Sequence, residues 1–147
     1  MIRPAWPSDV PAIVGLMADY WPELPAEKAP FAPRDAAVSA DRWIKDEICF
    51  VSEVRGEVTG VAAGVISNSF YNFSFRAATL LLWYVVPGHR NGTGGNLLDA
   101  FETEAWRRGA QQVIAGYVAR RRDPAMDRLL KRRGYVLSDM CYLKEPG

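Results

Sequence analysis

A glycine-rich turn between an apolar segment and a helical pattern is the part of this sequence whose residue types could do chemistry. Residues 80–86 are apolar and end at Pro87, and residues 88–95 read Gly-His-Arg-Asn-Gly-Thr-Gly-Gly before Leu97 and Leu98 open a helical pattern. This order predicts a strand that delivers free backbone N–H groups to a helix N-terminus, where they and the helix dipole bind phosphate. Glycines let the anion approach the backbone closely. The turn is therefore a candidate site for a phosphorylated cofactor, although a plain tight turn would also need glycines.

The order of residues excludes the two common phosphate-binding motifs. A Walker loop requires Gly-Lys-Ser/Thr at the start of the helix, whereas Gly95 is followed by Asn96 and Leu97. A dinucleotide fingerprint requires three spaced glycines, and the string Gly92-Thr93-Gly94-Gly95 lacks the third.

The turn resembles the acetyl-CoA-binding motif of the GCN5-related N-acetyltransferases (GNATs). In that motif a strand ending V-x-P is followed by R/Q-x-x-G-x-G/A and by a helix with two leucines, and here Pro87, Arg90, the glycines and Leu97-Leu98 stand in that order. The resemblance covers nearly the whole chain, from residues 1–5 through the hairpin at 50–61 to a late helix entering Gly134-Tyr135. The strand ending at 83–85 is similar to small bacterial and phage-encoded members.

The resemblance implies an acyl-CoA-dependent N-acetyltransferase that moves an acetyl group from acetyl-CoA to a primary amine by direct attack in a ternary complex. The acceptor would be a small-molecule amine or a protein or peptide amine, with no metal required. The family's central strands splay, here between residues 84–86 and 115–117, and a backbone N–H near Val85 would polarise the thioester carbonyl. By resemblance, the cofactor-binding residues are Tyr84, Val85, Val86, Arg90, Asn91, Gly92, Thr93, Gly94, Gly95 and Asn96.

The glycine loop has two registers on the family pattern. Counted from Arg90, the glycine positions fall on Thr93 and Gly95; counted from His89, they fall on Gly92 and Gly94, which fits the leucine pair better. The loop is therefore one residue shorter than usual in the second register.

Catalytic residues are not assigned by the sequence. The position at which many members carry a proton-donating tyrosine, five residues before Tyr135, holds Leu130, and residues 80–86 contain no acid. The remaining candidates for proton transfer, each with a structural role as its alternative, are Asp19, Glu23, Tyr84, Tyr117 and Tyr142. Without the usual acid and base, a catalytically weak or inactive acyl-CoA-binding regulatory module is the alternative function, and a nucleotide-binding domain is a third.

Aromatic residues gather in two segments outside the expected core. We expect them at the mouth of the acceptor site, where rings favour an aromatic or apolar amine; a homodimer interface is the alternative. One segment contains Phe70, Tyr71, Phe73 and Phe75, and the other Tyr20, Trp21 and Phe31.

The composition is that of one globular domain, residues 1–147. Eighteen basic and seventeen acidic residues leave a net charge of +1, which gives no global field for nucleic acid. Many of the basic residues lie in the last third of the sequence, where we expect them to form solvated faces or, by the resemblance, to lie in part beside the 3′-phosphate of the cofactor. They are Arg107, Arg108, Arg120, Arg121, Arg122, Arg128, Lys131, Arg132 and Arg133. Cys49 and Cys141 are expected as buried free thiols, and the single His89 excludes a metal site built on imidazoles. With neither an apolar run long enough for a membrane span nor a signal peptide, we expect a cytoplasmic protein.

Hydrophobic periodicity predicts the element order β-α-α-β-β-β-α-β-α-β-β, which is the order of the GNAT family. The resemblance therefore implies an α/β fold with a mixed, mostly antiparallel sheet of about seven strands and helices on both faces. The expected helices open at Pro7–Asp9, span about 35–45, run from the glycines to about 108, and run from 123 to 134. The first expected strand begins at Ile2. The other six span residues 48–54, 58–66, 79–86, 112–118, 135–137 and 140–143.

Overall fold

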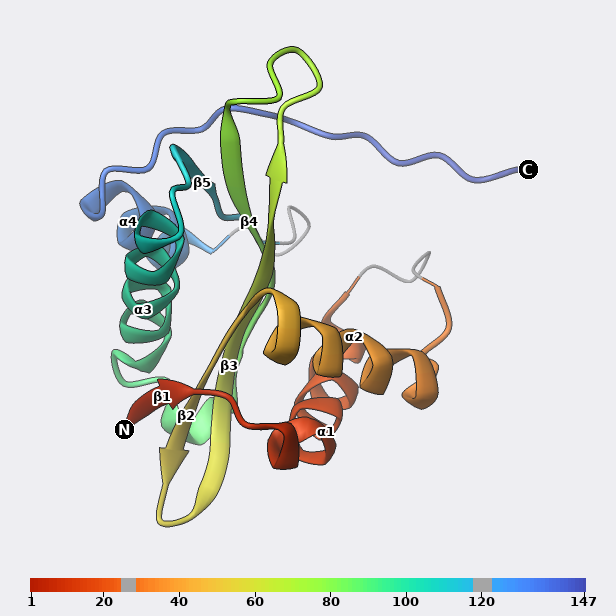
Figure 1. Ribbon diagram of the computed structural model, residues 1–147. Coiled ribbons are helices and arrows are strands. Elements are labelled where there is room, and N and C mark those ends of the chain that lie inside the picture. The colour runs from red at the N-terminus through yellow and green to blue at the C-terminus, as the bar shows by residue number, and fades with distance from the viewer. Residues whose placement is uncertain (25–28, 118–122) are drawn as a thin grey trace.

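The computed structural model describes residues 1–24, 29–117 and 123–147 and has a mixed α/β fold built on a five-stranded sheet (Figure 1). The strands follow one another across the sheet in chain order, and all neighbours are antiparallel except β4 and β5, which are parallel. They are β1 (Ile2–Pro4), β2 (Ile48–Val54), β3 (Glu57–Asn68), β4 (Arg76–Val85) and β5 (Gln112–Ile114).

Helices cover both faces of the sheet, as the sequence predicts. One face carries the 3₁₀ turn η1 (Pro7–Asp9), α1 (Val10–Tyr20), the 3₁₀ turn η2 (Trp21–Glu23) and α2 (Pro33–Asp46). The other face carries α3 (Thr93–Arg107), with α4 (Pro124–Arg132) beside it. Two buried clusters result: Ile13, Leu16 and Ala40 pack on the first face, and Leu97, Leu98 and Phe101 on the second.

A β-bulge in β4 lies just beyond the residues that pair with β5. The register passes from Ala63 opposite Leu82 to Gly64 opposite Leu80, so Leu81 has no partner on β3. Because one extra residue reverses which face each side chain takes, Leu80 packs with the α3 cluster and Leu82 with the α1–α2 cluster. Gly64 permits this geometry, since a Cβ there would overlap the carbonyl oxygen of Thr79.

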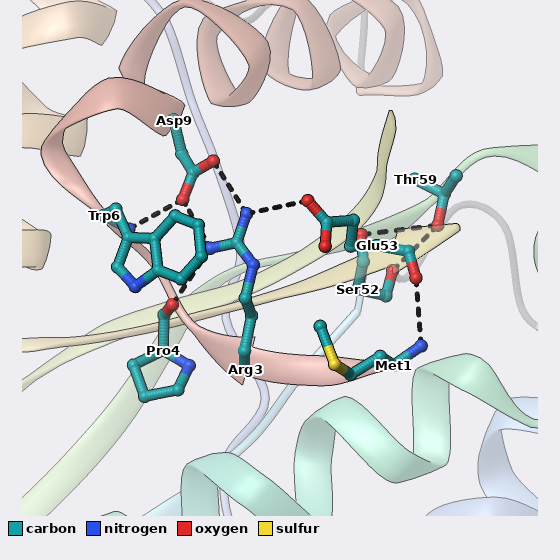
Figure 2. A network of polar contacts seen from close by, with 8 residues as sticks. All are labelled: Met1, Arg3, Pro4, Trp6, Asp9, Ser52, Glu53 and Thr59. Atoms are coloured by element: carbon teal, nitrogen blue, oxygen red, sulfur yellow. Dashed lines mark hydrogen bonds and ion pairs between the residues drawn. The ribbon is translucent and has the colours of Figure 1, made fainter. Parts of the chain in front are cut away.

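A buried ionic network fixes the start of α1 to the edge of the sheet (Figure 2). The Arg3 guanidinium on β1 donates to both carboxylate oxygens of Asp9, at 2.8 and 3.0 Å, and to Glu53 on β2 at 3.3 Å. The Trp6 ring stacks on it, with 3.7 Å between the guanidinium carbon and the ring centroid. These contacts hold the first residues of α1, and therefore set the direction in which its far end, at Tyr20, approaches β4.

The C-terminal residues correct one part of the predicted fold: the sheet has five strands instead of about seven, because residues 135–137 and 140–143 form none. Tyr135 is held beside α3 and α4, where its hydroxyl donates to Glu102 at 2.9 Å and its N–H to the Leu130 carbonyl at 3.0 Å. The chain then leaves the body of the protein without reaching the β5 edge (Figure 1), and Val136 and Tyr142 are 84% and 94% exposed.

Two smaller expectations also change. β5 ends at Ile114, short of the expected 118, and Val118 itself lies outside the described residues. Both cysteines are free, but only Cys49 is buried; Cys141 is exposed because it lies on the C-terminal segment. Burial raises the pKa of Cys49 to about 12.

Candidate functional site

The site begins where β4 and β5 separate. The two strands pair only between Ala77–Thr79 and Gln112–Ile114, although β4 continues to Val85. A cavity of about 410 Å³ lies beyond the last pair, with Leu80, Trp83 and Val85 on one side and Gly116 and Tyr117 on the other. This is the separation that the resemblance implies between the central strands.

The glycine turn closes one end of this first cavity. Val86 leads into a 3₁₀ turn at Pro87–His89, and Gly92 takes φ +80° as the N-cap of α3, a left-handed conformation that favours glycine. Asn96 donates its N–H to the Gly92 carbonyl at 3.2 Å. The amides of Thr93, Gly94 and Gly95 precede it in the first turn, where the helix provides no acceptor. Gly92, Gly94 and Gly95 line the cavity.

Arg90 connects the glycine turn to β4 and to η2, the 3₁₀ turn that follows α1. Its Nε donates to the Val85 carbonyl at 2.8 Å, its guanidinium lies 5.6 Å from the Tyr84 ring centroid, and it is 3.8 Å from the Glu23 carboxylate. Val86 donates its N–H to Thr59 on β3 at 2.9 Å. Because successive amides of a strand point to opposite edges, the Val85 N–H points away from β3, toward the cavity.

A second cation lies over the glycine turn. The Arg133 guanidinium occupies the space that a Cβ of Gly95 would take, and its Nε donates to Asp99 at 2.8 Å. This bond raises the Arg133 pKa, so the group is a permanent positive charge. In the late basic cluster, Arg107 and Arg108 also have a carboxylate partner, since both pair with Glu104. Residues 120–122 lie outside the described part of the chain.

The structure brings six of the ten predicted cofactor residues to the first cavity: Tyr84, Val85, Arg90, Gly92, Gly94 and Gly95 line it. Asn91 and Asn96 are exposed, and neither they nor Val86 and Thr93 are among the lining side chains. The part that each would play in holding a cofactor stays a prediction.

The five candidates for proton transfer divide clearly. Glu23, Tyr84 and Tyr117 line the first cavity, whereas Asp19 is an exposed residue of α1 and Tyr142 lies on the C-terminal segment. Burial, followed by the negative charge of Glu23, raises the pKa of Tyr84. The Tyr117 hydroxyl donates to Asp127 at 2.5 Å.

Helix α4 supplies cavity residues that the sequence did not identify. Met126 and Leu129 line the cavity one turn apart, whereas Leu130, where the motif count places the family's tyrosine, is not among the lining residues. Both leucines also pack against the α3 core cluster. Counting five residues back from Tyr135 therefore selects a position on α4 next to the face that lines the cavity, and not on that face. Positions three apart on a helix share a face, and that spacing could have identified Met126 and Leu129.

A second cavity, of about 470 Å³, adjoins the first, and Tyr20, Leu80, Leu81, Gly116 and Tyr117 line both. The structure separates the two aromatic segments of the sequence here. Tyr20, Trp21 and Phe31 line the second cavity, together with Trp43, which the sequence did not suggest. Phe70, Tyr71 and Phe73 are exposed at the tip of the β3–β4 hairpin and line neither cavity.

Comparison with known proteins decides the family. The model of the acetyltransferase (GNAT) family matches residues 13–135, which include the glycine turn and both strands of the cavity. The chain belongs to the GNAT family. No curated protein sequence matches it significantly.

Solved structures show the same GNAT fold at low sequence identity. A putative acetyltransferase from Agrobacterium tumefaciens is 18% identical, with 99% of both chains covered and a TM-score of 0.75. An aminoglycoside N-acetyltransferase in complex with CoA is 14% identical over 99% of this chain and 93% of that chain, with a TM-score of 0.77. A ribosomal-protein-alanine N-acetyltransferase from Brucella melitensis is 24% identical over 91% and 83%, with a TM-score of 0.75.

Within 1–24, 29–117 and 123–147, no helix combines the length and hydropathy needed to cross a bilayer. The same residues contain no group of three or more His, Cys, Asp and Glu side chains placed to hold a metal ion.

Proposed function

We propose that this GNAT protein transfers an acetyl group from acetyl-CoA to a primary amine by direct attack within a ternary complex. The observation that carries the proposal is the separation of β4 from β5, which opens a cavity ending at the N-terminus of α3. Similar structures bound to CoA support the same cofactor.

The residues present fit acetyl-CoA. The amides of Thr93, Gly94 and Gly95 suit the pyrophosphate, because a helix N-terminus offers both donors and a positive dipole end. Gly94 leaves this approach open, since a Cβ there would have Trp83 as its nearest neighbour, at 3.8 Å. The Arg133 guanidinium, paired with Asp99, lies beside the same turn. Acetyl-CoA supplies an activated thioester when it is bound.

The Val85 N–H is the donor we assign to the thioester carbonyl. It points toward the cavity, and the next peptide unit of the strand is held on both sides, because its Val85 carbonyl accepts from Arg90 at 2.8 Å and its Val86 N–H donates to Thr59 at 2.9 Å. A preorganised donor of this kind stabilises charge that develops on an oxygen during acyl transfer, and removing one such donor typically costs about 10²–10³-fold in rate.

Direct attack is favoured because the described lining of the first cavity contains no cysteine or serine that could carry the acetyl group. Cys49 lies in the cluster under α1 and α2, and its raised pKa keeps it protonated. Glu23 lines the cavity and is the carboxylate we assign to receive the amine proton through water. Asp123, the other lining acid, accepts the Ala125 N–H as the N-cap of α4.

Initial-rate kinetics test this proposal. With release of the CoA thiol as the readout, rates measured while both substrates are varied should give intersecting lines, as a ternary complex requires. Parallel lines would indicate a covalent acetyl-enzyme and contradict direct attack. If CoA binds but no amine causes thiol release from acetyl-CoA, the regulatory module is favoured instead. If ATP binds more tightly than CoA, the nucleotide-binding domain is favoured.

A further inference from the structure

The second cavity differs in chemistry from the first. The charged residues that line the first cavity, Glu23, Arg90 and Asp123, are all missing from the described lining of the second. That lining is apolar and rich in rings, which come from the end of α1, the turn η2, the segment before α2, α2 itself and the residues after β5: Tyr20, Trp21, Phe31, Trp43 and Tyr117. Met17 of α1 also lines this cavity.

The polar atoms of two of these rings, Trp21 and Tyr117, are engaged within the protein. The indole Nε1 of Trp21 donates to the Ala29 carbonyl at 3.0 Å, and the Tyr117 hydroxyl donates to Asp127 at 2.5 Å. The ring of Tyr20 packs against that of Tyr84, with 5.3 Å between their centroids. Since these atoms have protein partners, the surface that Trp21 and Tyr117 offer a ligand is mainly the carbon face of the rings, which binds apolar or aromatic groups.

The two cavities meet at the β4 bulge. Leu81, the residue without a partner on β3, lines both cavities, as do Tyr20 and Tyr117. A molecule in the second cavity therefore reaches the first past these three side chains. Glu23 lines the first cavity and not the second, and it lies close enough to Tyr20 that its negative charge, after burial, raises the pKa of the Tyr20 hydroxyl. The arrangement provides one carboxylate at the junction and an apolar chamber behind it.

We propose that the second cavity binds the acceptor, and that the acceptor is a primary amine joined by a short chain to one aromatic ring. This inference rests on the proposed acetyl transfer. The ring would lie among Trp21, Phe31 and Trp43, and the amine would lie at the junction. Glu23, the carboxylate assigned to receive the amine proton, lines the first cavity, so loss of that proton would leave the neutral amine that attack requires at the junction. A polycationic acceptor would leave several charges without partners in this lining.

The acceptor class is tested with four amines and acetyl-CoA, using thiol release to measure kcat/KM. The panel is 2-phenylethylamine, ethylamine, kanamycin and an alanine-initiated tetrapeptide. We expect 2-phenylethylamine to exceed each of the others by at least about tenfold, the discrimination that an apolar pocket provides. Comparison with ethylamine isolates the ring. Kanamycin or the peptide reacting as well as 2-phenylethylamine would overturn the acceptor proposal while leaving acetyl transfer intact.

Variants locate the ring. Phe31 lines only the second cavity, so Phe31→Ala should raise the KM for 2-phenylethylamine about tenfold and leave the KM for acetyl-CoA unchanged. Phe31→Leu keeps an apolar wall and should fall between the two. Phe73→Ala, which removes an aromatic ring exposed at the hairpin tip, is the matched control and should change neither constant. An unchanged KM in Phe31→Ala and Phe31→Leu would overturn the location.

Calorimetry separates the two levels of the proposal. If CoA binds and 2-phenylethylamine neither binds to the CoA complex nor reacts, the acceptor proposal is wrong and the cofactor site stands. If CoA itself does not bind, the proposed function fails, and the acceptor proposal fails with it.

Discussion

Gly64 shows how one residue can determine the geometry of the site. It faces Leu80 where β3 and β4 change register, and an added Cβ would overlap the Thr79 carbonyl oxygen and lie 2.9 Å from the Phe101 ring. We predict that Gly64→Ala lowers the free energy of unfolding by more than about 2 kcal/mol, measured by urea denaturation. Gly15→Ala in α1 is the control, because its Cβ would meet open space. Equal stability of the two variants would contradict the bulge.

Single residues are also where sequence reasoning is weakest. The two cysteines occupy similar apolar segments, yet Cys49 is buried and Cys141 is exposed. Leu129 and Leu130 are neighbours of the same type, and only Leu129 lines the cavity. Residue type and local pattern do not distinguish the members of these pairs, because exposure is decided by which distant element packs against each position.

At the scale of elements, the ionic network that holds β1 to α1 gives the protein an acid-sensitive point (Figure 2). Hydrogen bonds from Arg3 hold the pKa of Asp9 below its ordinary value of 3.8. The folded state therefore binds fewer protons, and the stability contributed by Asp9 is present above that value and is lost as the pH falls below it.

Replacing Asp9 tests this network. We predict that Asp9→Asn loses about 3 kcal/mol of stability at pH 7, because the buried Arg3 charge loses its main partner. Its stability should also fall less steeply than that of the natural chain as the pH drops through 4, measured by denaturation at several pH values. Asp41→Asn removes an exposed pair with Lys45 and should cost less than about 1 kcal/mol. Similar losses in both variants would contradict the buried role of Asp9.

Helix α4 presents Met126 and Leu129 to the cavity, and this predicts where an added proton donor would act. Leu129→Tyr should raise kcat, by no more than the ~10²–10⁴-fold that general acids provide, and should give a loss of rate near pH 10, where a phenol ionises. Leu130→Tyr should not raise kcat, because Leu130 does not line the cavity. A higher kcat in Leu130→Tyr but not in Leu129→Tyr would show that Leu130 occupies the position of the family's tyrosine, as counted from Tyr135.

At the scale of the whole molecule, the fold was predictable from the start of the chain through α4. Alternating and helical periods gave the right order of elements, because each element has one apolar face to bury. The prediction of the last two strands was wrong for a different reason. Residues 135–143 have the apolar character of strands, but a strand also requires a partner edge, and contacts of Tyr135 with α3 and α4 direct the chain away from β5. No local pattern encodes that competition.

The candidate site was predictable in part. The glycine turn and its neighbouring strand were recognisable because their chemistry depends on a contiguous motif. The second cavity was recognisable only as scattered aromatics, since Phe31 and Trp43 come together through the packing of α2 near α1. The homodimer stays a prediction, to be measured by light scattering on the purified chain.

Calorimetric titration with CoA tests the central claim, that the first cavity and the N-terminus of α3 form the cofactor site. We predict that the natural chain and Gly15→Val bind CoA with similar affinity, because Gly15 lies in α1 with open space around it. Gly94→Val should bind at least about tenfold more weakly, because its side chain would stand where the phosphate approaches the helix amides. Equal CoA affinity in Gly94→Val, with the fold intact, would contradict the site.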